Sequence, residues 1–332
     1  MHVTMCNNLR SKVEFLASLT RCQEWKDTKL NWYVFAAIMY FLSRGVSPLQ
    51  QNIAFTYLIV LFFIYASAGA ISNDYGDLEQ DRLLKKKKAI LSLKESKVVL
   101  LLLILSVVFE IVVLNLTQAF DFRFILITVG YGICLEYSLP PLRFKERGVW
   151  GLLFGSMVQR AIPVAILFTI FSFWTLSGVL YVIFLIMVGF RAMIVHQMKD
   201  YENDIKSRTK TMATNSGVER MVKLENASWI VELLTFFVFL ISLTLQMEKL
   251  FLLFGFVTYL LTWGGIKLWK YSIIQKLNKF SMSNAFLADW YYWWLPAIAA
   301  VALGTYTGNW LVLFFVAIMQ RFHFFNLIKK FV

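Results

Sequence analysis

Nine stretches of apolar residues, separated by segments that carry most of the charge, constrain the fold of this chain more than any other feature. One of them, 55–71, holds seventeen residues without a charge, and a helix needs about 20 mainly apolar residues to cross a bilayer. Hydrophobic residues make up 59% of the chain and charged residues only 16%, which is more apolar than a soluble domain. We therefore predict an all-α, polytopic membrane protein with nine spans, at residues 31–43, 53–72, 97–117, 122–138, 149–171, 178–199, 227–246, 249–268 and 291–318.

Basic residues fall mainly on one side of this predicted topology. The N-terminal segment and the loops at 73–96, 139–148, 199–226 and 269–290 hold most of the lysines and arginines outside the spans. Cytoplasmic loops of membrane proteins are enriched in these residues. The pattern therefore predicts that the N-terminus and these loops are cytoplasmic. After an odd number of spans, the C-terminus would lie on the opposite side.

The net charge of +13 fits either nucleic-acid binding or attraction to an anionic membrane surface. No basic and aromatic platform lies outside the predicted spans, so we expect contact with membrane lipid and no nucleic-acid partner. In the first thirty residues, Leu9, Val13 and Phe15 are mixed with basic residues, as in an interfacial helix. We predict an N-terminal interfacial segment over 1–30 and one membrane domain over 31–332.

A first acidic cluster stands at the end of the second predicted span, in Ser72–Arg82 (SNDYGDLEQDR). Asp74, Asp77 and Asp81 are spaced i, i+3 and i+7, which would place all three on one face of a helix. Carboxylates on one face repel one another unless a cation lies between them. Oxygen ligands at this spacing favour a hard divalent ion, Mg²⁺ before Ca²⁺ or Zn²⁺.

A second acidic cluster follows the sixth predicted span, in His196–Asp204 (HQMKDYEND). Asp200 and Asp204 are four residues apart and would share one helical face. Both clusters close an apolar span on the same predicted side of the membrane. We therefore expect the two clusters to face each other.

A basic loop lies between the clusters in the sequence, Tyr137–Gly148 (YSLPPLRFKERG). Its two prolines predict an extended segment, in which Arg143 and Lys145 would point to the same side. A diphosphate suits this arrangement, because Mg²⁺ bridges aspartates to phosphate oxygens while Arg and Lys bind the remaining oxygens. Arg147 is more consistent with a solvated basic loop.

Three segments of the chain together resemble the signature elements of the UbiA superfamily of intramembrane prenyltransferases. They are Asn73–Asp81 (NDYGDLEQD), Tyr137–Lys145 (YSLPPLRFK) and Lys199–Asp204 (KDYEND). The family pattern is NDxxDxxxD followed later by DxxxD. The basic loop is most similar to the branch that holds chlorophyll synthase, homogentisate prenyltransferases and digeranylgeranylglyceryl phosphate synthase. The likeness extends over nearly the whole chain, since the order of spans and acidic loops also agrees.

The resemblance implies nine helices bundled around a central cavity, with two Mg²⁺ ions and an isoprenyl diphosphate as donor. Ionisation of the donor would leave an allylic carbocation, which an aromatic or lipid acceptor then attacks. The resemblance also implies which residues act. The catalytic and metal-binding aspartates would be Asp74, Asp77, Asp81, Asp200 and Asp204, with Asn73 as a further metal ligand. The diphosphate would be bound by Asn73, Arg82, Tyr137, Arg143, Lys145 and Lys199.

Several roles have two interpretations at this level. Tyr137 either hydrogen-bonds the diphosphate or anchors the chain at the interface, and Lys199 is either a diphosphate ligand or a loop charge. His196 and Arg191 either face the acceptor or have structural roles, as a hydrogen-bonded histidine and an intramembrane ion-pair partner. Many relatives carry Arg-Pro after the first motif, whereas this chain has Lys85–Lys88. The sequence leaves open which of these lysines reaches the diphosphate.

Two other functions are compatible with the acidic residues. A terpene cyclase on the same scaffold would ionise the donor and let an internal alkene attack, giving a cyclic product without an acceptor. A transporter or channel would use the acids for cations and leave the diphosphate intact. Acids on one side only disfavour transport, because a conduction path needs polar groups through the bilayer.

Overall fold

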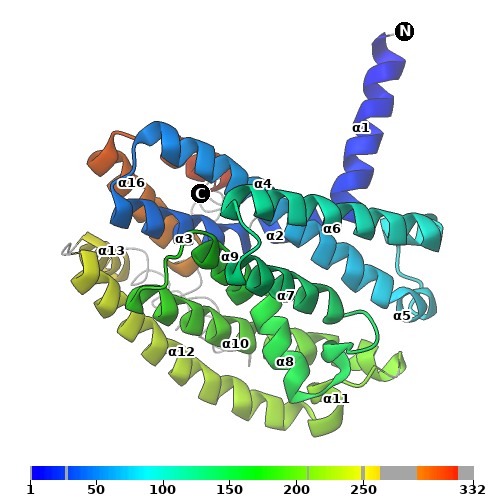
Figure 1. Cartoon of the computed structure of the whole chain (residues 1–332). Helices are drawn as coiled ribbons and strands as arrows, with labels where there is room; N and C mark the ends of the chain where they lie inside the picture. The colour runs from blue at the N-terminus through cyan, green and yellow to red at the C-terminus, as the bar shows by residue number, and fades with distance from the viewer. Residues whose placement is uncertain (1, 27–28, 208, 248–250, 262–289, 321–332) are drawn as a thin grey trace. The chain divides into compact units, whose positions relative to one another are not determined.

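The apolar runs of the sequence form helices, because a backbone inside a bilayer must satisfy its hydrogen bonds internally. A computed structural model describes residues 2–26, 29–207, 209–247, 251–261 and 290–320, and all regular structure in these ranges is helical (Figure 1). The predicted all-α class is confirmed. The principal helices are α1 (His2–Leu19), α2 (Cys22–Lys26), α3 (Lys29–Arg44), α4 (Pro48–Gly76), α5 (Leu78–Leu83), α6 (Glu95–Thr117), α7 (Phe122–Glu136), α8 (Val149–Ser156), α9 (Ile162–Ile170), α10 (Leu176–Lys206), α11 (Met212–Ser216), α12 (Val218–Met247), α13 (Phe251–Tyr259) and α16 (Leu295–Thr307).

Five helical stretches of the described chain are long and apolar enough to cross a membrane. Each matches one of the predicted spans. Two further predicted spans correspond to α3 and α7, whose 16 and 15 residues fall short of the ~20 that a full crossing needs. The span predicted at 249–268 lies partly outside the described residues. The five stretches are Pro48–Gly76, Glu95–Thr117, Val149–Ile170, Leu176–Lys206 and Val218–Gln246.

The chain divides into two units by the contacts between its residues. α4, α10 and α12 contribute residues to both. Unit 1 contains all the predicted site residues. Unit 1 comprises Met1–Trp25, Tyr57–Phe173 and Val182–Leu233, and unit 2 comprises Lys26–Thr56, Trp174–Tyr181 and Leu234–Val332.

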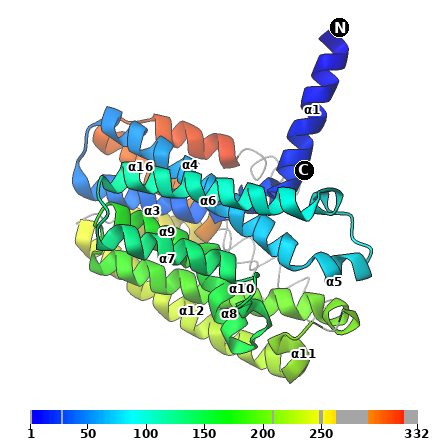
Figure 2. The same cartoon turned by 45° about the vertical axis from the view of Figure 1, so that its right-hand side comes forward.

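The core of unit 1 is formed where α7 packs against α6 and α9 (Figure 2). Phe109 of α6 stacks on Tyr131 of α7, with the ring centroids 4.1 Å apart. Tyr65 of α4 donates a hydrogen bond to the main-chain oxygen of Val158 at 2.9 Å. A buried tyrosine hydroxyl needs such a partner, so this bond fixes α4 against the π-helical turn Met157–Ala161 that joins α8 to α9.

A buried ion-pair cluster joins α10 to α12 within unit 1. The Arg191 guanidinium donates to both carboxylate oxygens of Glu232, at 2.5 and 3.0 Å, and lies 3.6 Å from Glu225. The three side chains are at most 4% exposed. Charges in a membrane segment are costly unless paired, and this bidentate pairing satisfies that requirement. Of the two interpretations for Arg191, the structure therefore supports the ion pair.

Unit 2 is built around α3, along which α16 packs. The Tyr181 hydroxyl donates to the main-chain oxygen of Trp32 at 3.0 Å, and the Phe35 ring meets the Tyr181 ring edge to face at 5.2 Å. Buried aromatic side chains thus join α10 to α3. The 16-residue α3 is almost entirely buried.

The span predicted at 291–318 is wrong as a single helix. α16 ends at Thr307, and Gly308 follows with a left-handed φ of +72°, a conformation that favours glycine. A second apolar helix then runs over Leu311–Gln320. The Gln320 amide donates to the main-chain oxygen of Trp293 at 3.0 Å, so the second helix runs antiparallel to the helix before it.

The turn between these two helices is held by polar side chains of α4. The Asn309 amide donates to Gln51 at 2.8 Å and to Asn52 at 3.0 Å. Asn309 is buried, so its amide needs such partners. The predicted side of the C-terminus depended on a single ninth span. The C-terminus lies outside the described residues, and its side remains a prediction.

Candidate active site

The first acidic motif lies across a break between two helices. α4 ends at Gly76 and α5 begins at Leu78, so Asp77 stands at the junction. A Cβ atom on Gly76 would lie 2.4 Å from the main-chain oxygen of Ser138, and only glycine permits so close an approach. Asp77 therefore interrupts the single helix that was predicted for the three aspartates. Asp74 and Asp81 nevertheless face the same side, because one ammonium group, that of Lys88, pairs with both.

Asp77 faces the basic loop. The Lys145 ammonium forms an ion pair with Asp77, and the Arg143 guanidinium lies 4.0 Å from the same carboxylate. The prediction that this loop is extended is wrong, because Arg143 has a left-handed backbone and Phe144–Glu146 form a 3₁₀ turn. Both cations nevertheless point to one side, as expected. Burial lowers the pKa of the Lys145 ammonium, and the neighbouring Asp77 only partly offsets this effect.

Asp74 and Asp81 share a lysine that the sequence left unassigned. The Lys88 ammonium lies 2.6 Å from Asp74 and 2.5 Å from Asp81, and Lys86 lies 3.2 Å from Asp81. Burial by itself lowers the pKa of Lys88, but its pairs with the two aspartates outweigh burial and raise that pKa. Lys86 and Lys88 are thus the lysines of the basic run that reach the acidic motif.

The second acidic motif occupies the last turns of α10. Nδ1 of His196 lies 3.1 Å from the Asp200 carboxylate, one turn further along the helix. The Thr211 hydroxyl donates to Asp204 at 3.3 Å. Thr211 also caps α11 through its hydrogen bond with the Thr214 amide. The chain after α10 therefore turns back and places hydroxyl groups beside the motif.

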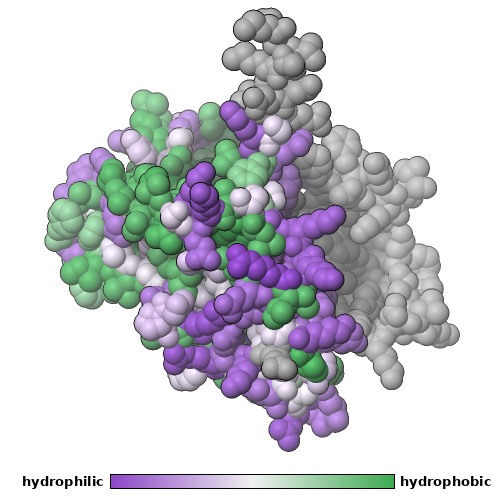
Figure 3. All heavy atoms as spheres, turned by 90° about the vertical axis from the view of Figure 1, so that its right-hand side faces the viewer, coloured by the Kyte–Doolittle hydropathy of each residue, from purple (hydrophilic) through white to green (hydrophobic). Residues whose placement is uncertain are grey.

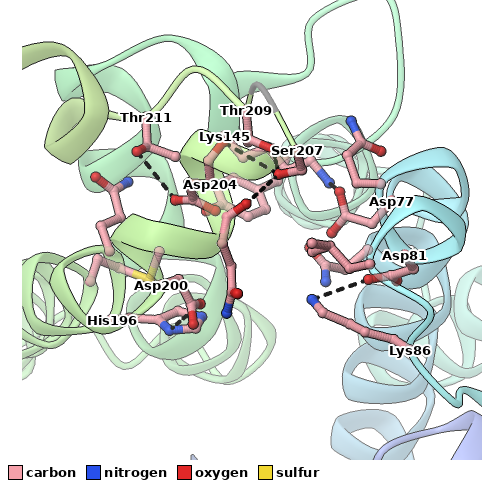
Figure 4. A pocket seen from close by; sticks show the side chains of 17 residues that line it. Asp77, Asp81, Lys86, Lys145, His196, Asp200, Asp204, Ser207, Thr209 and Thr211 are labelled. Atoms are coloured by element: carbon pink, nitrogen blue, oxygen red, sulfur yellow. Dashed lines mark hydrogen bonds and ion pairs between the residues drawn. The ribbon is translucent and has the colours of Figure 1, made fainter.

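The two acidic motifs line one cleft of about 160 Å³. Figure 4 shows Asp77 and Asp81 on one side of the cleft and Asp200 and Asp204 on the other. Lys86 pairs with Asp81 and Lys145 with Asp77. The cleft belongs to unit 1, in which hydrophilic side chains gather toward the end where α5 and α11 lie (Figure 3). The residues lining it are Asn73, Asp77, Gln80, Asp81, Leu84, Lys86, Tyr137, Lys145, Met193, His196, Gln197, Asp200, Asn203, Asp204, Ser207, Thr209 and Thr211.

The carboxylates of the cleft are close enough to disturb one another. Asp204 lies beyond the predicted span 178–199. Burial is the main cause that raises its pKa to about 6, and the negative charge of Asp200 is the second. Asp77, across the cleft, makes a smaller contribution in the same direction. Like charges that raise a pKa in this way are relieved when a cation binds between them.

The donor set suits a hard divalent cation. Aspartate and asparagine oxygens line the cleft from both sides, and Mg²⁺ prefers oxygen ligands. Among the described residues, no three acidic, histidine or cysteine side chains already converge as a metal-binding group. Lysine ammonium groups pair with the carboxylates instead, Lys88 with Asp74 and Asp81 and Lys145 with Asp77. The residues therefore fit Mg²⁺ by chemistry, with the ammonium groups available to bind phosphate.

Not every predicted site residue reaches this cleft. Arg82 and Lys199 are exposed and do not line it, and Arg191 is held in the buried pair with Glu232. Asp74 lines a neighbouring cavity. Tyr137 and His196 do line the cleft, so the structure favours a site position for Tyr137 over an interfacial anchor.

Sequence reasoning missed several residues that complete the site. Ser138 donates a hydrogen bond to the Asn73 side chain at 2.9 Å, which orients that amide. Thr209 and Thr211 line the cleft from the loop after α10. Only the run Lys85–Lys88 gave a signal in the sequence, and its spacing could not distinguish one lysine from another.

Comparison with known proteins identifies this arrangement of helices. The family model described as the UbiA prenyltransferase family matches residues 30–291. A UbiA homolog from Archaeoglobus fulgidus, solved with GPP and Mg²⁺, has a TM-score of 0.60 at 15% identity, over 90% of this chain and 99% of that chain. The same homolog with DMAPP and Mg²⁺ gives 0.59 at 14% identity, over 90% and 98%.

A third structure, from work on digeranylgeranylglyceryl phosphate synthase in membranes, has a TM-score of 0.54 at 14% identity, over 91% of this chain and 99% of that chain. At these identities the structural likeness establishes the fold alone. No curated protein matches the sequence at a significant level.

Proposed function

Because the chain belongs to the UbiA prenyltransferase family, we propose that it transfers an isoprenyl chain from its diphosphate to an aromatic or lipid acceptor within the membrane. Integral membrane character follows from the family and from the five long apolar helices of the described residues. The single observation that carries the proposal is the cleft in which Asp77 and Asp81 face Asp200 and Asp204, with Lys86 and Lys145 beside them (Figure 4).

In this proposal the acids bind metal and the lysines bind the donor. Asn73, Asp77, Asp81, Asp200 and Asp204 would hold Mg²⁺ from the cleft. Asp74, the sixth predicted ligand, would act from the adjoining cavity. A bound Mg²⁺ would neutralise the diphosphate charge and stabilise it as a leaving group. The A. fulgidus homolog solved with prenyl diphosphates and Mg²⁺ supports this assignment. The expectation of two ions comes from the family resemblance.

Side chains of this protein would orient the donor and protect the reacting carbon. Lys145 and Lys86 would bind diphosphate oxygens by charge-assisted hydrogen bonds, with Arg143 at the edge of the site. Tyr137 lines the same cleft as Lys145 and would donate a hydrogen bond to the same group. The apolar helices would exclude water from the allylic cation. His196, whose Nδ1 lies 3.1 Å from the Asp200 carboxylate, would face the acceptor.

The proposed topology places the N-terminus and the cleft in the cytoplasm. The supporting observation is the concentration of Lys and Arg in the loops on that side. An isoprenyl diphosphate has a charged head and an apolar chain, so it would enter with its head at this polar end.

The experiment that tests the function separates transfer from cyclisation. The purified protein is incubated with Mg²⁺ and farnesyl or geranylgeranyl diphosphate, first alone and then with aromatic and lipid acceptors. We expect pyrophosphate release only when an acceptor is present. Cyclic hydrocarbon or alcohol formed without acceptor would assign the terpene cyclase reaction instead. An intact donor under all conditions would overturn both.

Arg143→Ala is expected to raise the KM for the donor about tenfold, since a charge-assisted hydrogen bond contributes roughly 1.5–3 kcal/mol. Arg147→Ala is the matched control, because the Arg147 guanidinium donates to the main-chain oxygens of Leu142 and Pro141 in its own loop. Its KM should stay within about twofold, as expected for a local loop contact. Steady-state kinetics over a donor series measures both, and equal effects of the two variants would contradict the role of Arg143.

Chelation of divalent cations with EDTA is expected to abolish pyrophosphate release, and added Mg²⁺ should restore it. The reason is that four carboxylates facing one cleft repel a diphosphate unless a cation neutralises them. Titration of Mg²⁺ into the chelated protein measures the requirement. Full activity in excess EDTA would contradict a metal-dependent site.

A further inference from the structure

The N-terminal segment, which precedes the residues matched by the family model, is anchored beside the acidic motif. Leu19 at the end of α1 is buried against Ile71 and Ile90. Trp25 of α2 is also buried, and its ring meets Phe62 and Phe63 edge to face at 5.6 and 4.9 Å. These two anchors flank the junction between α1 and α2, so they fix the residues between them against unit 1.

Arg21 lies at this junction and points toward the first motif. Its backbone has a left-handed φ of +51°, which is unfavourable for a residue other than glycine. Its guanidinium is 3.1 Å from Glu24 and 3.9 Å from Asp74. A strained backbone kept by its surroundings often marks a functional position.

Asp74 opens toward this segment. It is 3% exposed, and it lines a cavity of about 430 Å³ together with Arg21, Lys87 and Lys88. Glu14 and Glu24 also line this cavity. The cations lie nearest to Asp74, with Lys88 at 2.6 Å and Arg21 at 3.9 Å. Lys88 also pairs with Asp81, which lines the cleft. The cavity and the cleft are thus connected through one lysine shared by two motif aspartates.

We propose that Arg21 is a further donor-binding residue, which binds a phosphate group of the donor from the Asp74 side while Lys145 and Lys86 bind from the cleft side. The inference rests on the proposed function, because it takes Asp74 as a ligand of the metal that holds the diphosphate. A phosphate that shares a metal ion with Asp74 needs free space beside that carboxylate. The cavity lined by Asp74 and Arg21 provides this space. Arginine is suited to this role because its planar donors match phosphate oxygens.

The test measures binding of inorganic pyrophosphate with Mg²⁺ to the detergent-solubilised full chain, by calorimetry, in the absence of prenyl donor. Arg21→Gln is expected to raise the pyrophosphate dissociation constant roughly tenfold. Arg21→Lys should give a smaller increase, because it keeps the charge but not the planar donors. Lys12→Ala is the matched control, because Lys12 is exposed on α1 and its loss removes one charge from the same segment. It should change the constant by less than about twofold.

Two further measurements separate phosphate binding from a structural role. Arg21→Gln should not weaken binding of Mg²⁺ alone, because removing a cation next to Asp74 does not disfavour another cation there. Lys87→Gln removes the exposed cation of the same cavity without touching the N-terminal anchors. It should weaken pyrophosphate binding about threefold, even if Arg21→Gln does not fold. Unchanged pyrophosphate affinity in Arg21→Gln would overturn the inference. If Arg21→Gln does not fold, unchanged affinity in Lys87→Gln would overturn it. So would an equal loss in Lys12→Ala.

The outcome is independent of the reaction. If Arg21 affects pyrophosphate binding but no prenyl donor is consumed, the anion site stands and the proposed function fails. If donors are consumed normally by Arg21→Gln with unchanged KM and unchanged pyrophosphate affinity, the proposed function stands and Arg21 has no part in it.

Discussion

Asp77→Ala and Asp200→Ala are each expected to lower kcat at least about a hundred- to a thousandfold, the range seen when an electrostatic group of an active site is removed. The two residues face each other across the cleft, from the junction of α4 with α5 and from α10 (Figure 4). Without either aspartate, the carboxylates on the opposite side of the cleft would not be able to hold the metal and the diphosphate together. Asp74→Ala should have a comparable effect through the adjoining cavity. Pyrophosphate release in the presence of donor, acceptor and Mg²⁺ measures the loss.

The chain offers a matched acidic control beside each of the two facing aspartates. Glu79 and Glu202 are each two residues away from the tested position, and both are exposed and absent from the cleft lining. Their replacement by alanine should change kcat by less than about twofold, as for surface substitutions in general. The Asp77 and Asp200 variants should remain folded in detergent, because exposed or half-buried carboxylates contribute little packing. A near-normal rate in Asp200→Ala would mean that the metal assignment is wrong at that position.

Glu232→Ala is expected to give the largest loss of stability, about 3–5 kcal/mol in the free energy of unfolding. The substitution leaves the Arg191 guanidinium without its bidentate partner in a segment where both side chains are at most 4% exposed. The guanidinium then keeps Glu225, at 3.6 Å, and this loss of its hydrogen-bonded partner in a buried ion pair is the physical cause. Thermal unfolding in detergent, followed by circular dichroism, measures the effect.

Glu219→Ala is the control for this prediction, since Glu219 pairs with Lys223 on the same helix but is 86% exposed. Its pair is of the solvent-exposed i, i+4 kind, which contributes about 0.3–0.5 kcal/mol. An acceptor-facing role for Arg191 makes a different prediction, namely that Glu232→Ala changes the KM for the acceptor while the unfolding midpoint stays the same. That result would reverse the structural assignment.

The sequence was sufficient wherever a local pattern decided the structure. Apolar runs near the bilayer thickness became helices. The bounds of α6 are close to the predicted span, whereas α4 and α10 continue several residues beyond theirs. The spacing of the aspartates identified the candidate ligands, because carboxylates that cluster at the end of an apolar span repel one another unless a cation lies between them. The antiparallel turn at Gly308 was missed because a single glycine in a long apolar run is a weak break signal.

Residue order alone was enough to establish the kind of molecule and the chemistry of its polar end: helices that cross a membrane, and two acidic motifs with a basic loop. Which of these groups meet became known only from the packing of the helices. Asp77 stands at the junction of two helices, and Lys88 is shared by the carboxylates of Asp74 and Asp81. The N-terminal segment brings Arg21 to Asp74 from more than fifty residues away. Such contacts depend on how distant segments pack, and residue spacing along the chain carries no information about them.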